Sequence, residues 1–223
     1  AGSGAFTLNK SVAGKIAKAI VNSAQIVLRS AMDYESAFKA ASNGKQAFMD
    51  ASQAMVENMM ESFAKRQELS FLYGSSATGL GVISGNSWST GDGTITLTDA
   101  SWAAGIWVGM KNCVVDALAA SGNVVAANLI IESVNISAKE LTINSATDVG
   151  ASEIQPGCYL VFYGSDTNEC NGIDKILLNR DALYNINAAN YELWEATSYN
   201  VNGSISMDKV QLAATQAVAL GLK

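Results

Sequence analysis

The 223-residue sequence contains no histidine. Histidine is the commonest general base, the usual partner of a nucleophilic serine or cysteine, and the commonest metal ligand in proteins. Its absence argues against hydrolases that use a Ser–His or Cys–His pair, and against metal centres bound through imidazole. An enzyme with this sequence would have to use lysine, tyrosine or paired carboxylates.

Cysteine is also scarce, with only Cys113, Cys158 and Cys170 in the chain. An odd number of cysteines without a Cys-x-x-Cys spacing fits neither a zinc site nor a disulfide framework. We interpret all three as buried, reduced thiols of a cytosolic protein. The sequence therefore predicts no metal and no cofactor.

Charged residues are few, at 15% of the chain, and the net charge is −6 with a sequence pI of about 4.6. The largest basic cluster, Lys10, Lys15 and Lys18, holds only three residues. Nucleic-acid binding requires clustered cations that replace phosphate counterions, so sequence-specific binding of nucleic acid is disfavoured. A sparsely charged surface suits a subunit that is covered by its neighbours.

Long hydrophobic runs are missing too. No charged-then-apolar leader opens the chain, and no apolar run reaches the roughly 18 residues that a membrane-spanning helix requires. We therefore expect a protein that is neither exported nor inserted in a membrane. Hydrophobic residues nevertheless make up 49% of the sequence, which is a globular composition.

The region before Gly74 is rich in alanine, lysine, methionine and glutamate and predicts a long helix from Gly44 to Tyr73. Glu61 and Lys65 are placed to form an i, i+4 ion pair. Ser42 or Asn43 can cap the start, and Gly74 can end the helix. The apolar stripe follows the helical period and consists of Phe48, Met55, Met59 and Phe63, widened by Val56 and Met60.

The segment before this helix predicts an arm that reaches away from the body. The spacing of Val12, Ile16 and Ile20 predicts a short amphipathic helix over Lys10–Ile20. The alternation over Gln25–Asp33 predicts an extended strand.

The middle of the chain is rich in glycine, threonine and β-branched residues and predicts a small barrel or sandwich of short antiparallel strands. A hairpin is expected around Ser121-Gly122-Asn123, and turns are expected at Gly91-Asp92-Gly93 and Ser137-Ala138-Lys139. A final helix is expected over Met207–Leu220. The predicted strands cover 94–97, 106–108, 114–118, 124–131, 132–136, 140–143 and 158–163.

Two motifs that could carry chemistry are better explained as loops. Gly79-Leu80-Gly81-Val82-Ile83-Ser84 resembles a dinucleotide-binding glycine motif, but serine replaces the third glycine and a helix precedes it. Asp166, Asn168 and Asn171 resemble a calcium loop that lacks the glutamate at the twelfth position. We find no combination of residues that amounts to an active site.

Several segments together resemble the major capsid proteins of tailed bacteriophages. Gln25–Tyr34 followed by a helix that closes with Lys65-Arg-Gln-Glu-Leu-Ser-Phe-Leu-Tyr-Gly74 is similar to the extended loop and spine helix of that family. Thr78–Gly81 is similar to the step into a β-rich insertion. Further matching segments are Thr94–Ala100, Gly109-Met110, Val134–Ile143, Asn171–Leu177, Leu183–Ile186, Tyr191 and Trp194.

The resemblance implies an α+β fold with a long spine helix, an extended loop, an inserted small antiparallel β-barrel and a partial axial domain. It divides the chain into an arm over 1–34, a peripheral domain over 35–80, the β insertion over 81–164 and an incomplete axial domain over 165–223. Family members generally continue with further strands, so we expect either a fragment or the ordered part of a longer protein. The implied assembly-interface residues are Phe6, Leu8, Lys15, Lys18, Arg29, Tyr34 and Trp194.

The function implied is structural: self-assembly through pentamers and hexamers into an icosahedral head that encloses the DNA genome. Scaffold and portal proteins are the implied partners, and the implied location is the virion capsid, assembled in the cytoplasm of the bacterial host. Two alternatives stay open. A β-rich adhesin or binding module on a helical stalk would form a small fixed oligomer, and an enzyme without histidine would present a deep pocket with perturbed titratable groups.

Overall fold

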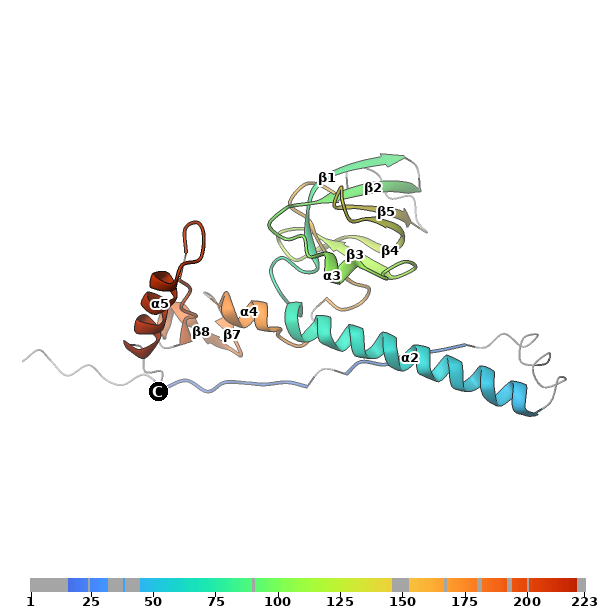
Figure 1. Cartoon of the computed structure of the whole chain (residues 1–223), viewed down its shortest axis with the longest axis horizontal. Coiled ribbons are helices and arrows are strands. Elements are labelled where there is room, and N and C mark those ends of the chain that lie inside the picture. Colours follow the sequence, from blue (N-terminus) through green and yellow to red (C-terminus); the bar gives the residue numbers. More distant parts are fainter. Residues whose placement is uncertain are drawn as a thin grey trace, which may run out of the picture. The chain divides into compact units, whose positions relative to one another are not determined.

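The structure is a computed structural model that describes residues 16–23, 25–31, 38, 45–89, 91–145, 153–166, 168–179, 182–191, 194–199 and 201–219. The chain forms two compact units, of which one comprises residues 1–22 and 177–223 and the other residues 23–176. The predicted α+β class is confirmed, because a long helix, a six-strand antiparallel sheet and a few short helices make up the fold (Figure 1). The capsid-specific description of that fold stays a prediction.

The long helix α2 spans Lys45–Tyr73, so the prediction of a helix from Gly44 to Tyr73 is confirmed to within one residue. Its 29 residues rise over about 44 Å. Only Leu69 and Ser70 are buried among its side chains that the structure describes, because the helix meets the rest of its unit mainly through its last turns. The predicted pair between Glu61 and Lys65 is wrong: the Lys65 ammonium donates instead to the carbonyl of Val108.

Six antiparallel strands close into a barrel in the order β1-β2-β5-β4-β3-β6. The predicted hairpin around Ser121-Gly122-Asn123 is confirmed, since β3 pairs with β4 across it. Pairing of β1 with β6 closes the barrel between Gly81 and Leu160. The strands are β1 (Gly81–Ser89), β2 (Asp92–Leu97), β3 (Val114–Leu118), β4 (Val124–Asn135), β5 (Glu140–Ser145) and β6 (Tyr159–Phe162).

The barrel interior is a single apolar core. In β2 and β5 every second residue is buried, as expected for strands with one face toward the interior. Trp107 is fully buried in this core and stacks on Trp102 at a ring separation of 6.3 Å. Gly93 lies opposite Trp88, and a Cβ at position 93 would come within 2.1 Å of the indole ring, so only glycine fits there.

A buried carboxylate in β3 bonds to the backbone of β4 and to the turn after β6. Asp116 in β3 is only 4% exposed. It accepts hydrogen bonds from the backbone N–H of Asn128 and of Gly164, both at 2.9 Å. Asn128 has a positive φ of 60° at an irregularity in the β3–β4 ladder, a conformation that asparagine tolerates better than most residues. The carboxylate therefore holds this irregularity and the turn after β6 in place.

Three predictions in the middle of the chain need correction. The strand predicted at Ile106–Val108 is the short helix α3 (Ala104–Trp107), because a three-residue apolar run does not distinguish a strand from a buried helical turn. The predicted loop over Gly79–Ser84 is a turn only as far as Leu80, since β1 begins at Gly81. The strands predicted at 124–131 and 132–136 are one strand, β4.

The arm also differs from its prediction. Residues 16–20 are not helical, and the rest of the helix predicted over Lys10–Ile20 lies outside the described residues. Residues 25–31 have no strand partner in the described part of the chain, so the predicted strand is an unpaired segment there. A strand is defined by its ladder bonds, and none of the described residues forms a ladder with this segment.

The unit of residues 1–22 and 177–223 contains short elements and one longer helix. The longer helix α5 spans Met207–Ala219, which confirms the predicted terminal helix up to the last described residue. The short elements are β7 (Ala182–Leu183), β8 (Ile186–Asn187) and the 3-10 helix η1 (Ala188–Asn190). The short helix α4 (Ile173–Leu177) belongs to the larger unit up to residue 176. Among the described residues, no helix is both long and apolar enough to span a bilayer.

Candidate functional site

The C-terminal turns of α2 are fastened to the segment that follows the barrel. Ser70 donates from its hydroxyl to the Glu169 carboxylate at 2.8 Å, and the Arg66 guanidinium lies 3.7 Å from the same carboxylate. The N–H of Gly172 donates to the carbonyl of Gly74 at 2.7 Å. A Cβ at Gly74 would lie 2.3 Å from the carbonyl oxygen of Cys170, so the helix ends on glycine because of this close approach.

Arg66 makes the charged contacts of this junction, one with an aromatic ring and one with a carboxylate. Its guanidinium carbon lies 3.7 Å from the centre of the Phe162 ring, a cation–π contact with the last residue of β6. Burial lowers the pKa of Arg66, and the negative charge of Glu169 opposes that change. Burial likewise raises the pKa of the nearby Cys113 thiol, while the Arg66 charge pulls it back down. The junction thus holds a paired, half-buried charge rather than a reactive one.

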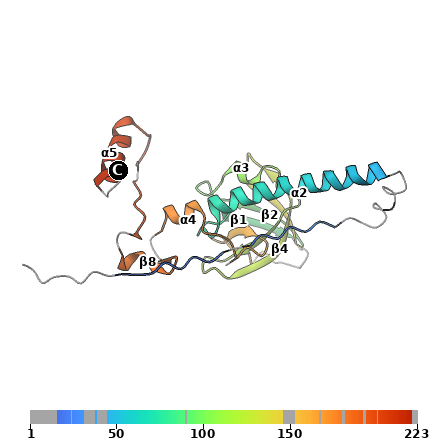
Figure 2. The same cartoon turned by 90° about the horizontal axis from the view of Figure 1, so that it is seen from below.

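A groove of about 510 Å³ lies between α2 and the turn after β6, and arm residues 25–28 line one side of it. Figures 1 and 2 show the extended arm segment passing alongside α2. Ile26 and Leu28 are 42% and 40% exposed, whereas Val27 between them is 76% exposed. The extended segment therefore turns one face toward the body and the other to solvent. Opposite it, α2 contributes Arg66, Gln67, Ser70 and Phe71.

Several large apolar side chains of α2 are more than half exposed in the part of the chain that the structure describes. Met49, Val56 and Met60 are 52%, 57% and 61% exposed and follow one another at spacings of seven and four. Phe71 continues the same side of the helix toward the groove and is 56% exposed. An apolar face that extends along three turns of a helix is characteristic of a surface that another chain covers.

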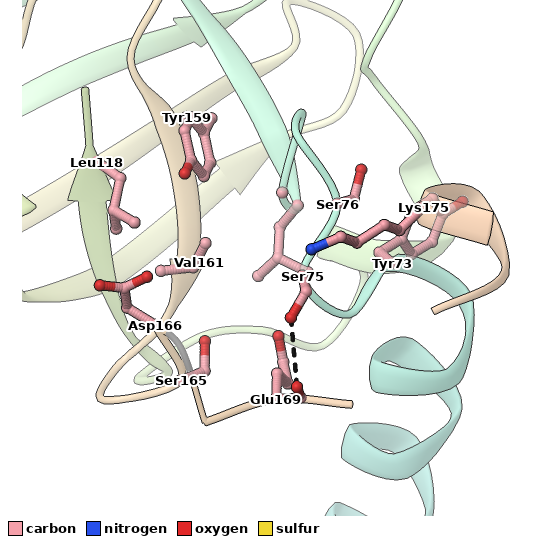
Figure 3. Close-up of a pocket in the computed structure, with 12 residues that line it drawn as sticks. Tyr73, Ser75, Ser76, Leu118, Tyr159, Val161, Ser165, Asp166, Glu169 and Lys175 are labelled. Carbon is pink, nitrogen blue, oxygen red and sulfur yellow. Dashed lines mark hydrogen bonds between the residues drawn. The ribbon is translucent and has the colours of Figure 1, made fainter. Parts of the chain in front are cut away.

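A second cavity, of about 210 Å³, opens between the end of α2, β6 and α4 (Figure 3). Lys175 reaches into it from α4, and Ser75 at its rim donates to the carbonyl of Glu169 at 3.2 Å. Burial, followed by the negative charge of Asp166, raises the pKa of Tyr159 on its wall. A general base needs a pKa close to neutrality, so this shift moves Tyr159 away from that role. Among the described residues, no three cysteine or acidic side chains group together as a metal site would require.

The structure places three of the seven predicted interface residues. Lys18 and Arg29 are exposed on the arm. Trp194 is 36% exposed, and its indole N–H donates to the carbonyl of Leu183 at 3.1 Å, so part of its role lies inside its own unit. The other four predicted residues, Phe6, Leu8, Lys15 and Tyr34, lie outside the described residues.

Sequence reasoning missed Glu169 and Arg66, which organise the junction. Ser70 and Glu169 are 99 positions apart, so no periodicity connects them. One usable signal was Ser70 itself, a polar residue directly after the buried Leu69. A buried hydroxyl requires a partner, although the sequence does not say which.

Three comparisons tested the chain against known proteins. A scan of protein-family models, a search of curated proteins and a search of solved structures each found no match.

Proposed function

We propose that this chain is a structural subunit that builds a shell by association with its own copies, as part of a tailed-bacteriophage major capsid protein. It forms pentamers and hexamers of an icosahedral head that encloses the DNA genome. Scaffold and portal proteins are its proposed partners, and the virion capsid, assembled in the bacterial cytoplasm, is its proposed location. The proposal assigns the chain no catalytic step and no cofactor.

The observation that carries the proposal is the uncovered helix α2. The barrel has its own closed core, whereas α2 extends for about 44 Å and exposes Met49, Val56 and Met60. Covering each of these half-exposed side chains with a partner would contribute about 1 kcal/mol. In a monomer these side chains stay in contact with water and stabilise nothing. In an assembly a neighbouring subunit can bury them, and that burial stabilises the contact between the two copies.

The arm adds a second requirement for neighbours. Residues 25–31 have backbone groups outside any ladder within the described part of the chain, so they are available to an adjacent subunit. In a closed shell each copy both gives and receives such contacts, and many weak contacts repeated by symmetry act with high avidity. The proposal therefore assigns the same role to the long exposed helix and to the extended arm: both provide contacts between neighbouring copies.

The test is the particle mass of the intact gene product, measured by light scattering and checked by negative-stain imaging. We expect closed shells, or pentamers and hexamers that convert to them. Deletion of Thr7–Ser23 should leave a folded protein, by circular dichroism, that cannot close shells. Wild-type particles from that deletion would refute the role of the arm. A stable monomer from the intact gene would refute the proposal and favour the binding-module alternative.

A further inference from the structure

The cavity of about 210 Å³ at the end of α2 is built from segments that are distant in sequence. Tyr73 and Ser75 come from the end of α2 and the turn after it, Tyr159 comes from β6, and Lys175 comes from α4. All of the lining residues belong to the larger unit of residues 23–176. One water molecule requires a cavity of about 10–15 Å³, so this one has room for a small organic molecule.

Two opposite charges lie on the walls of this cavity. Asp166 follows the turn after β6, Lys175 lies on α4, and both side chains are half-buried. Within the described part of the chain, neither of them forms an ion pair or a hydrogen bond. Figure 3 shows Lys175 extending its ammonium from one side of the cavity and Asp166 on the other side. The cavity therefore presents one carboxylate and one ammonium that a bound molecule can pair with.

The neighbouring charges are already paired. The Glu169 carboxylate lies 3.7 Å from the Arg66 guanidinium. Asp174, next to the lysine in α4, accepts a hydrogen bond from the hydroxyl of Ser76. The acid and the lysine on the cavity walls are thus the charges that remain for a ligand in this part of the described structure.

Two hydroxyl groups add polar contacts at the same place. Burial, followed by the charge of Asp166, raises the pKa of Tyr159, which indicates that the carboxylate lies close to this phenol. Ser165 is 5% exposed, and its Oγ has no hydrogen-bond partner among the described residues. Figure 3 shows this Oγ pointing toward the cavity. Buried hydroxyls nearly always have a partner, so an unpaired one at a cavity wall points to a bound molecule.

The remaining wall is apolar. Leu80, Leu118 and Val161 line the cavity, and all three are buried. An acceptor, a cation and an apolar surface together match a zwitterion with a small hydrocarbon side chain. A divalent cation matches less well, because the lysine repels it and the described residues hold no group of three acidic or cysteine side chains.

We propose that this cavity binds a free amino acid with a small apolar side chain, with its ammonium on Asp166 and its carboxylate on Lys175. The hydroxyls of Tyr159 and Ser165 hydrogen-bond to the charged groups of the ligand, and its hydrocarbon contacts Val161. The site does not depend on the proposed function, because every lining residue belongs to one copy of the chain. The ligand contacts both segments that connect the barrel to the helices, so it stabilises the folded chain.

Equilibrium dialysis of the full chain against radiolabelled L-valine tests the site in any state of assembly. We expect saturable binding with a dissociation constant of about 1 mM, as befits so small a ligand. Isobutylamine and isovalerate each lack one of the two charged groups of valine, so each should compete at least about tenfold more weakly than unlabelled valine. Equal competition by either compound would overturn the assignment of a zwitterion.

Conservative substitutions test the two charges. Asp166→Asn and Lys175→Gln should each raise the dissociation constant of valine at least about tenfold, because each removes one charged contact. The matched controls Asp92→Asn and Lys111→Gln change exposed residues outside the cavity and should alter the constant less than about twofold. Circular dichroism of each variant checks that it is folded.

Thermal unfolding provides a second readout. Valine at about twenty times its dissociation constant should raise the Tm by several degrees in the wild type and by much less in Asp166→Asn. Ser165→Ala should weaken binding about fivefold without lowering the Tm of the valine-free chain, because the hydroxyl has no partner there to lose. No saturable binding up to about 20 mM valine, or wild-type affinity in both charge variants, would overturn this inference and leave the proposed function standing. Valine binding by a chain that stays monomeric would support this site and refute the shell.

Discussion

Replacement of Asp116 is the sharpest test of how the barrel is held together. The carboxylate is almost fully buried and satisfies two backbone donors, at Asn128 and Gly164. Asp116→Ala removes both hydrogen bonds at once. Asp116→Asn keeps the shape of the side chain but leaves one acceptor oxygen, so one of the two donors must lose its partner.

The expected magnitude follows from these two contacts. A hydrogen bond to a charged group contributes about 1.5–3 kcal/mol, which gives an upper limit of about 6 kcal/mol for the pair. Both hydrogen bonds are only partly buried, so water can replace part of the lost acceptor and reduce the loss. We therefore expect Asp116→Ala to lower the free energy of unfolding by about 3 kcal/mol and Asp116→Asn by about half of that.

The assay is urea unfolding followed by tryptophan fluorescence, since Trp88, Trp102 and Trp107 all lie in the barrel. The control is Asp99→Ala, because Asp99 is also acidic and bonded, to Lys139 at 2.6 Å, but its side chain is 88% exposed. An exposed ion pair contributes about 1 kcal/mol at most. If Asp116→Ala destabilises the barrel no more than Asp99→Ala does, the structural role of the buried carboxylate is refuted.

Gly93→Ala should lower the Tm by several degrees in calorimetry, because a Cβ would lie 2.1 Å from the Trp88 ring. Gly105→Ala, where nothing lies within 4 Å, should leave the Tm almost unchanged, and equal effects would contradict this reasoning. Because burial raises the pKa of Cys113, its alkylation by iodoacetamide should require a higher pH in the folded chain than in urea. Arg66→Gln removes a positive charge that lowers this pKa, so mass spectrometry should show the alkylation midpoint at a still higher pH; a midpoint at lower pH would contradict this assignment.

Elements defined by local patterns were predictable from the sequence. The helix ending at Tyr73 follows from its apolar period, and the hairpin at Ser121-Gly122-Asn123 follows from its turn residues. Strand β1 was missed because Gly85 and several polar residues interrupt its alternation. It is held as a strand by pairing with both β2 and β6, which is tertiary information.

The surfaces were less predictable than the elements. The apolar stripe predicted from the sequence included Val56 and Met60 of the helix, but not Met49. Apolar residues at the helical period normally indicate a face that packs against a core. The structure shows instead that these side chains stay exposed. Whether a stripe is buried depends on where the rest of the chain passes. That is decided by contacts such as Ser70 with Glu169, which are distant in sequence.

The junction at Gly74 and Gly172 has a consequence for how this protein can change over evolutionary time. The chain leaves α2 and returns to it at nearly the same point, and the first and last strands of the barrel are neighbours. Insertions or deletions within the barrel therefore do not alter the distance between the end of α2 and the start of α4. The barrel can be lengthened, replaced or used to display a foreign sequence while the helix keeps its position.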